Sequence, residues 1–263
     1  MNNLIQVSLS NALQKMVLKV SLLKIGILKN ILIRMFIKHY KIDMNDYPRK
    51  SVHQYKHFND FFTREILPDK RPIDGSENSL IAPTDGKIVE FGKIEEGKLI
   101  QIKGMEYKLS GLLNNNEMLS LNYERGSFIS IYLAPFNYHR IHAPLEGNLE
   151  EAIMVPGEMN RVDLKALSDI ESLYTKNQRL IAKFEGPNFD CILIMVAARN
   201  VASMTYEMKT EAFKKGDEVG RFNLGSTVVV LLPNETEIEW TPNVSFGTNV
   251  KVGEKIAQLS KIK

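Results

Sequence analysis

The stretch Gly-Arg-Phe-Asn-Leu-Gly-Ser-Thr-Val-Val-Val-Leu-Leu at residues 220–232 joins a polar turn to an unbroken run of β-branched and aliphatic residues. A short apolar run entered through glycine and serine predicts a buried strand that begins near Gly225 and Ser226. A Gly-Ser pair at a strand entrance is ordinarily part of a turn. It also permits a reaction of the backbone itself, because glycine has no side chain to block an approach to its carbonyl.

The Ser226 hydroxyl can add to the Gly225 carbonyl and replace the amide by an ester. β-Elimination would then free Gly225 as a new C-terminus, and the dehydroalanine left at position 226 would tautomerise and hydrolyse to a pyruvoyl group. A free hydroxyl is a poor nucleophile at neutral pH, so the step needs a base. Imidazole, with a pKa near neutrality, suits that role.

The residues around this stretch predict a β-rich body within an α+β fold. Residues 51–66 carry an apolar face at helical spacing, and a boundary is expected near residues 43–48. Short apolar runs bounded by Gly, Pro, Asn or Asp follow and predict strands at 86–91, 99–102, 127–133, 181–184, 191–196, 227–232 and 236–240.

An internal repeat runs through the body. Ala-Pro-Thr-Asp-Gly-Lys-Ile at 82–88 is echoed by Ala-Pro-Leu-Glu-Gly-Asn-Leu at 143–149, and the turn at 215–219 is echoed at 252–256. These turns resemble those of lipoyl-type barrel-sandwich hybrids, which predicts a curled, duplicated sheet. Ordinary hairpins use the same residues and are the alternative.

The N-terminal arm, residues 1–45, differs in charge from the catalytic body expected over residues 46–263. Residues 1–42 contain seven Lys or Arg and no Asp or Glu, leaving 27 of the 34 basic residues against 31 acidic ones, a net charge of −4. No uncharged apolar run reaches the ~18–20 residues that would span a bilayer. We therefore expect one or two helices, broken near Gly26, that lie in the membrane interface. The alternative is a basic helical pair packed on the protein's own core.

Two of the five histidines, His139 and His142, share one short segment. Two histidines make an incomplete metal site, and no Cys or His partners accompany them, so no metal is expected. The single cysteine, Cys191, lies in an apolar run and reads as a buried thiol.

Seven blocks in order resemble the phosphatidylserine decarboxylases, which are membrane-associated, pyruvoyl-dependent enzymes. The blocks are Phe-Phe-Thr-Arg-Glu at 61–65, Arg-Pro-Ile at 71–73, Ala-Pro-Thr-Asp-Gly at 82–86, Tyr-Leu-Ala-Pro-Phe-Asn-Tyr-His-Arg-Ile-His at 132–142, Pro-Gly at 156–157, Leu-Tyr-Thr-Lys-Asn-Gln-Arg at 173–179 and Gly-Arg-Phe-Asn-Leu-Gly-Ser-Thr at 220–227. Thr84 is the one departure, where the family is expected to carry a small residue such as Ala.

The resemblance assigns roles residue by residue. It makes Asp85 and His142 the triad partners of Ser226, the serine at which the zymogen cuts itself after Gly225, and it gives His139 a part in decarboxylation. A carboxylate would fix the imidazole tautomer, as in other Ser-His-Asp sets. The pyruvoyl group formed from Ser226 would bind the substrate amine as a Schiff base and accept electrons as CO2 leaves. This replaces pyridoxal phosphate and needs no metal.

As the resemblance implies, the substrate is phosphatidylserine and the product phosphatidylethanolamine, in phospholipid biosynthesis. The chain would become a heterodimer of a large chain, 1–225, and a small chain, 226–263, with a homodimer left open and no nucleic-acid partner. It would be a peripheral protein on the cytoplasmic side of a bacterial cell membrane, with an organelle inner membrane as the alternative.

Two other functions remain open at this point. A pyruvoyl enzyme could act on another amino-acid headgroup, and a non-catalytic lipid-binding protein could use the basic arm and the β scaffold. The order Asp85, His142, Ser226 would also suit a serine hydrolase, but no Gly-x-Ser-x-Gly motif surrounds Ser226.

Overall fold

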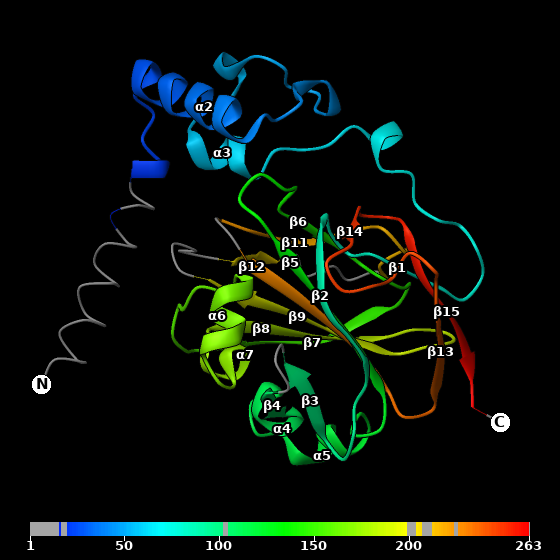
Figure 1. The fold of residues 1–263 in the computed structure, drawn as a ribbon. Helices are drawn as coiled ribbons and strands as arrows, with labels where there is room; N and C mark the ends of the chain where they lie inside the picture. The colour runs from blue at the N-terminus through cyan, green and yellow to red at the C-terminus, as the bar shows by residue number, and fades with distance from the viewer. Residues whose placement is uncertain are drawn as a thin grey trace, which may run out of the picture.

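The computed structural model describes residue 16 and residues 20–101, 105–198, 204–206, 212–223 and 226–262. The chain has an α+β fold with few helices and a β-rich body (Figure 1). Its helices are α2 (Gly26–Tyr40), α3 (Phe58–Phe62), α4 (Leu109–Leu112), α5 (Glu117–Leu121), α6 (Leu164–Asp169) and α7 (Leu173–Lys176). Its strands are β1 (Ser79–Ile81), β2 (Gly86–Lys93), β3 (Lys98–Gln101), β4 (Met105–Lys108), β5 (Ser127–Leu133), β6 (Arg140–His142), β7 (Asn148–Val155), β8 (Arg179–Glu185), β9 (Cys191–Ala197), β10 (Met204–Tyr206), β11 (Glu218–Phe222), β12 (Ser226–Leu232), β13 (Thr236–Trp240), β14 (Asn249–Val250) and β15 (Lys255–Lys261).

The largest sheet has seven strands in the order β14-β2-β5-β12-β9-β8-β7. The apolar run that opened the sequence analysis forms its middle strand, β12, and every residue of that strand is buried. β12 pairs antiparallel with β5 and with β9, so Ser226 lies opposite both Leu133 and Ala197. Helices α6 and α7 lie over one face of the sheet (Figure 1). The expected strands are confirmed, although Ile102 lies outside the described residues.

The two halves of the Ala-Pro repeat exchange equivalent hydrogen bonds. The backbone N–H of Ile81 donates to the Pro144 carbonyl at 3.2 Å, and the N–H of His142 donates to the Pro83 carbonyl at 2.8 Å. Ile81 and His142 hold the same position in the two repeats, just before the Ala-Pro pair. The two segments therefore lie side by side, which brings His142 next to the loop that carries Asp85.

Each Ala-Pro segment also meets one of the two repeated turns. Ala82 receives the N–H of Gly253 and donates to the Glu254 carbonyl at 2.8 Å. Ala143 makes the same pair of bonds with Gly216 and Asp217, again donating at 2.8 Å. The strand pairs that continue from these turns, β1 with β15 and β6 with β11, are both antiparallel and both contain one register shift.

The prediction of one helix over residues 51–66 is wrong in extent. A 3₁₀ turn at Val52–Gln54 and the five-residue α3 stand there, separated by extended backbone. Ser51 and Gln54 form a closed capping box, and the His57 side chain accepts a hydrogen bond from the Asp60 N–H to cap α3. Two N-terminal caps within six residues start two short segments instead of one helix.

The arm contains helical residues before and after Gly26, although only residues 16, 20 and 21 are described as helical on the N-terminal side. Helix α2 begins at Gly26 after a non-helical stretch, while residues 1–15 and 17–19 lie outside the described part of the chain. Its inner face, with Ile33 at the centre, packs on Val52, Tyr55 and Phe61. Among the described residues, no helix is both long and apolar enough to cross a bilayer.

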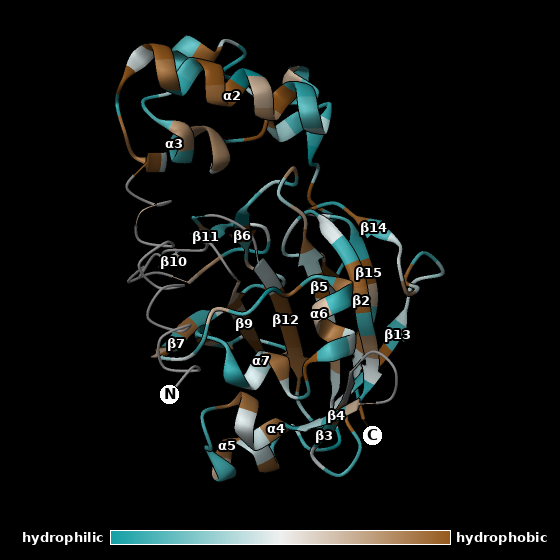
Figure 2. Cartoon of the chain, turned by 60° about the vertical axis from the view of Figure 1, so that its left-hand side comes forward, coloured by the Kyte–Doolittle hydropathy of each residue, from teal (hydrophilic) through white to brown (hydrophobic). Residues whose placement is uncertain are grey.

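Helix α2 is built largely of apolar residues (Figure 2), and those on the side opposite Ile33 are exposed. Ile27, Ile31 and Met35 follow one another at four-residue spacing and are 79%, 48% and 64% exposed. Residues at this spacing share one side of a helix. The helix is therefore apolar on two sides, and only one of them faces the protein.

Candidate active site

Ser226 is the first residue of β12 and is fully buried between β5 and β9. Its Oγ has no hydrogen-bond partner among the described residues. Leu224 and Gly225, the other side of the predicted cleavage point, lie outside the described residues. A buried hydroxyl without a partner is costly for stability and is expected mainly where a protein uses it.

His139 lies close to this strand entrance through its backbone. Its carbonyl accepts the N–H of Phe222 at 3.0 Å, and its Nε2 lies 3.1 Å from the carbonyl of Ala134, the residue that follows the cross-strand partner of Ser226. The imidazole stacks on Phe62 of α3, with ring centroids 4.1 Å apart. A carbonyl only accepts, so Nε2 carries the proton, and the unprotonated Nδ1 has no partner within the described chain.

The electrostatic environment keeps His139 neutral. Complete burial, followed by the positive charge of Arg64, lowers its pKa to about 3. Arg64 is itself buried and donates from Nη2 to the Tyr47 hydroxyl and the Phe136 carbonyl. The histidine therefore stays an uncharged imidazole with one N–H across the physiological pH range.

His142 is held at both ring nitrogens. Its Nδ1 lies 2.7 Å from the Gly216 carbonyl, and its Nε2 lies 3.0 Å from the Tyr138 hydroxyl. The carbonyl fixes the proton on Nδ1, so Nε2 carries the lone pair and accepts from Tyr138. Burial lowers the pKa of His142, while the Gly216 carbonyl and the charges of Glu218 and Asp85 act against that shift.

Asp85 is clamped by an arginine and a backbone amide. Arg71 binds both carboxylate oxygens, with Nε 2.9 Å from Oδ1 and Nη2 2.6 Å from Oδ2, and the Val252 N–H donates to Oδ1 at 2.9 Å. Among the described residues, these are the hydrogen-bond partners of the Asp85 carboxylate, and its effect on His142 is electrostatic. The structure thus places Asp85 and His142 on neighbouring segments. Each side chain is hydrogen bonded to other groups: Asp85 to Arg71 and Val252, and His142 to Gly216 and Tyr138.

Two polar residues near the histidines, Arg140 and Asn137, make contacts within the protein. Arg140 pairs with Glu218 at 2.7 Å and with Glu65 at 3.1 Å. The Asn137 side chain accepts the N–H of Ala134 at 2.8 Å and closes the loop before His139. Both side chains shape the loop between β5 and β6.

Sequence reasoning missed three neighbours of the site. Arg71 stood in a family block without a role, and Tyr138 stood beside the histidines. Gly216 has a backbone φ of +88°, and a Cβ there would lie 2.8 Å from Ile73, so glycine is needed. The repeat of its turn, at 215–219 and again at 252–256, could have singled out Gly216 from the sequence. Only the fold shows that its carbonyl contacts His142.

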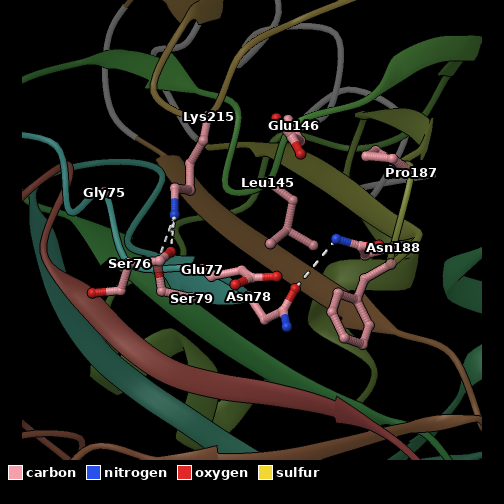
Figure 3. Close-up of a pocket in the computed structure, with 11 residues that line it drawn as sticks. Gly75, Ser76, Glu77, Asn78, Ser79, Leu145, Glu146, Pro187, Asn188 and Lys215 are labelled. Carbon is pink, nitrogen blue, oxygen red and sulfur yellow. Dashed lines mark hydrogen bonds between the residues drawn. The ribbon is translucent and has the colours of Figure 1, made fainter.

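A cavity of about 200 Å³ lies elsewhere, between residues 75–79, the second Ala-Pro repeat and Lys215 (Figure 3). The Lys215 ammonium donates to the Ser76 carbonyl at 2.8 Å and to Ser79 Oγ at 2.6 Å. Glu146, the repeat counterpart of Asp85, lines the same cavity. None of Asp85, His139, His142 and Ser226 lines it, so this cavity is separate from the candidate active site.

Comparison with known proteins places this site in a family. The family model described as phosphatidylserine decarboxylase matches residues 58–258. The phosphatidylserine decarboxylase proenzyme of Psychrobacter arcticus is 37% identical over 243 residues, covering 87% of each chain. The proenzymes so named from Psychromonas ingrahamii and Coxiella burnetii are 34% and 35% identical, covering 93% and 90% of this chain and 92% and 90% of their own. The chain belongs to the phosphatidylserine decarboxylase family of lyases.

Proposed function

We propose that this chain is a proenzyme that cuts itself between Gly225 and Ser226 and then decarboxylates phosphatidylserine to phosphatidylethanolamine. The observation that carries the proposal is Ser226 itself, the first residue of the central strand, whose fully buried hydroxyl has no partner among the described residues. Family membership supports the reaction, and pyruvoyl chemistry is typical of the family.

The surroundings of Ser226 fit a pyruvoyl group. That group is small and uncharged, and it lacks a backbone N–H. The site offers an apolar place for it between Leu133 and Ala197, the residues opposite position 226 on the two neighbouring strands. When formed, the group supplies an electron-accepting carbonyl next to the substrate carboxylate.

We assign the self-cleavage base to His142. Its Nδ1–H is fixed by Gly216, so the lone pair on Nε2 can accept the Ser226 proton once it is released from Tyr138. Asp85 acts through its negative charge, which stabilises a protonated His142. Arg71 and the Val252 N–H keep that carboxylate in place.

We assign proton supply during decarboxylation to His139. The imidazole is neutral, and its single proton is on Nε2, which now donates to the Ala134 carbonyl. Stacking on Phe62 holds the ring plane fixed. A fixed, neutral donor close to residue 226 suits the delivery of one proton at one position.

Helix α2 supports a membrane-facing arm. The open row of Ile27, Ile31 and Met35 would enter the acyl boundary, and nearby basic side chains such as Lys24 and Lys38 would meet anionic headgroups. This arrangement would make the protein peripheral on the cytoplasmic side of the cell membrane. Residues 1–45 would then form the arm and 46–263 the catalytic body.

We also infer that the body is a duplicated sheet of the barrel-sandwich type. The matching hydrogen bonds of Ala82 and Ala143 with their turns support this reading. After cleavage, the small chain 226–263 would stay with the large chain 1–225, because β12 is paired on both sides.

The test is the mass of the denatured protein, with Ser226→Ala as the variant. We expect the wild type to give fragments of about 26 and 4 kDa, by ordinary residue masses, with a ketone-reactive group at the start of the smaller one. Ser226→Ala should remain one inactive chain of 30.0 kDa. Ser226→Thr, which keeps a hydroxyl, is the matched variant. A cut or active Ser226→Ala protein would defeat the mechanism.

A further inference from the structure

A cluster of polar side chains is buried on the far side of β12 from Ser226. It contains Glu90, Tyr107, Ser130, Tyr174 and Thr227, which we call the hydroxyl cluster. The five residues come from β2, β4, β5, α7 and β12. Consecutive residues of a strand point to opposite faces, so Thr227 turns away from the side on which Ser226 lies.

Sheet register and covering elements bring the cluster together. Glu90 lies opposite Ser130, and Ser130 lies opposite Val229, which is two residues from Thr227 and on the same face. The rings of Tyr107 and Tyr174 meet edge to face with centroids 5.9 Å apart. Register thus places Glu90, Ser130 and Thr227 on one face of three neighbouring strands, and the ring contact joins β4 to α7.

The members of the cluster interact electrostatically. Burial raises the pKa of both tyrosines well above the usual value, and the nearby Glu90 carboxylate raises it further. Thr227 and Ser130 lower the pKa of Tyr174, which places their hydroxyls close to its own. Within the described residues, however, none of the four hydroxyl oxygens has a partner at good hydrogen-bonding geometry.

Such a cluster is a poor device for stability. Buried hydroxyls without partners destabilise a folded protein. Valine has nearly the shape of threonine and would suit the middle of a buried strand, where Val228, Val229 and Val230 follow. The position next to the cleavage point nevertheless carries a hydroxyl that reaches into the cluster.

Self-cleavage gives that hydroxyl a purpose. The inference rests on the proposed function: once Gly225–Ser226 is cut and residue 226 becomes a pyruvoyl group, that residue has lost its backbone N–H. Thr227 is then the first residue of the small chain with both backbone groups. A chain end is poorly ordered unless it is tied down.

We propose that the hydroxyl cluster becomes a positioning site once the chain is cut. The Thr227 hydroxyl then hydrogen bonds within the cluster and holds the cut end of β12, so that residue 226 keeps its place for decarboxylation. Thr227 and Tyr174 are its central positioning residues, because their hydroxyls come from the cut strand and from the helix that covers it. The cluster acts through strand β12 and does not touch the substrate.

The test compares Thr227→Val with Thr227→Ser in the full-length protein. We expect Thr227→Val to cleave itself and to unfold at a temperature no lower than the wild type. Its turnover per ketone-reactive group should fall about tenfold or more, since small misplacements of a reacting group are costly. Thr227→Ser should restore turnover. Hydrogen exchange at the amides of Val228 and Val229 should be faster in the cleaved Thr227→Val protein.

Two further variants complete the design. Tyr174→Phe removes the partner hydroxyl and should lower turnover per ketone-reactive group in the same way. Thr236→Val makes the same change at a buried threonine of β13, outside the hydroxyl cluster, and should leave turnover unchanged.

Several results would overturn the proposal. Normal turnover in both Thr227→Val and Tyr174→Phe would do so, as would an equal loss in Thr236→Val. Failure of Thr227→Val to cleave, with Thr227→Ser cleaving, would move the role of the cluster to a step before the cut. An uncut wild-type chain would instead defeat the proposed function, and this inference with it.

Discussion

The state of His142 shows how much of the candidate site depends on single neighbours. The Gly216 carbonyl selects one tautomer, and the Tyr138 hydroxyl occupies the lone pair that a base would use. Asp85, held by Arg71, contributes charge from its own position. At the residue scale, hydrogen bonds from neighbouring groups therefore fix the protonation site of His142 before any reaction.

Replacing Tyr138 by Phe should shift the pH dependence of self-cleavage. The base must be neutral, and burial holds the pKa of His142 below its usual 6.5. Self-cleavage should therefore stay fast below pH 6.5 and slow only as the pH falls through the lowered pKa. A hydrogen bond to Nε2 favours the neutral imidazole, so its loss should raise that pKa and move the slow limb to higher pH.

The measurement is the rate at which the intact chain disappears, followed by mass at several pH values. Tyr132→Phe, a half-buried tyrosine on β5, is the matched control and should leave the profile in place. A Tyr138→Phe profile that moves to lower pH, or does not move, would exclude the assigned role of Tyr138.

Helix α2 packs on the protein with one face and exposes apolar residues on the other. Ile33 is fully buried against the segment that leads to α3, while Ile27 and Met35 remain open. The same segment carries Phe62, which stacks on His139, so α2 is connected to the site through α3. Events at the outer face of α2 can therefore reach the histidine through packed side chains.

Ile31→Glu should weaken binding to vesicles that contain anionic lipid by about tenfold or more, because it puts a charge into the apolar row and opposes anionic headgroups. The fold and self-cleavage should be unchanged, since Ile31 is outside the packed face of α2. Co-sedimentation with anionic and with neutral vesicles measures the effect.

Met118→Glu provides the control for this experiment. Met118 is 77% exposed on α5, at the end of the molecule away from α2 (Figure 1). Equal loss of vesicle binding in both variants would show that added charge alone is responsible. Unchanged binding in Ile31→Glu would assign α2 to the alternative, a helix that serves the protein's own core.

On the scale of the whole molecule, the predicted cut falls where it disturbs the fold least. The small chain would contain β12 to β15, and these strands pair with β5, β9, β2 and β1 of the large chain. A strand buried between two others cannot leave without breaking both ladders and exposing its apolar residues. The seven-stranded sheet would thus hold the two chains together after cleavage.

We expect fragments 1–225 and 226–263 to migrate as one species on native size exclusion and to separate only in denaturant. Removal of the last strand, β15, by deleting residues 255–263 should weaken this association, because β15 pairs with β1 of the large chain. Spontaneous separation of the wild-type fragments in native buffer would contradict the expectation. Mass analysis of the single peak identifies its components.

The sequence alone determined the elements whose signals are local. The apolar run after Ser226 predicted β12, the short bounded runs predicted the strands of the body, and the repeated Ala-Pro and Gly turns indicated an internal repeat. The helix over 51–66 failed because caps at Ser51 and His57 override an apolar periodicity. The family blocks singled out Asp85, His139, His142 and Ser226 as candidates.

Only the tertiary structure decided which groups these candidates meet. Arg71 holds Asp85, and Gly216 holds His142, through contacts between residues that are 14 and 74 positions apart. The hydroxyl cluster likewise draws its five members from separate strands and a helix. Strand order and register set these contacts, and both arise from long-range pairing that no local pattern encodes.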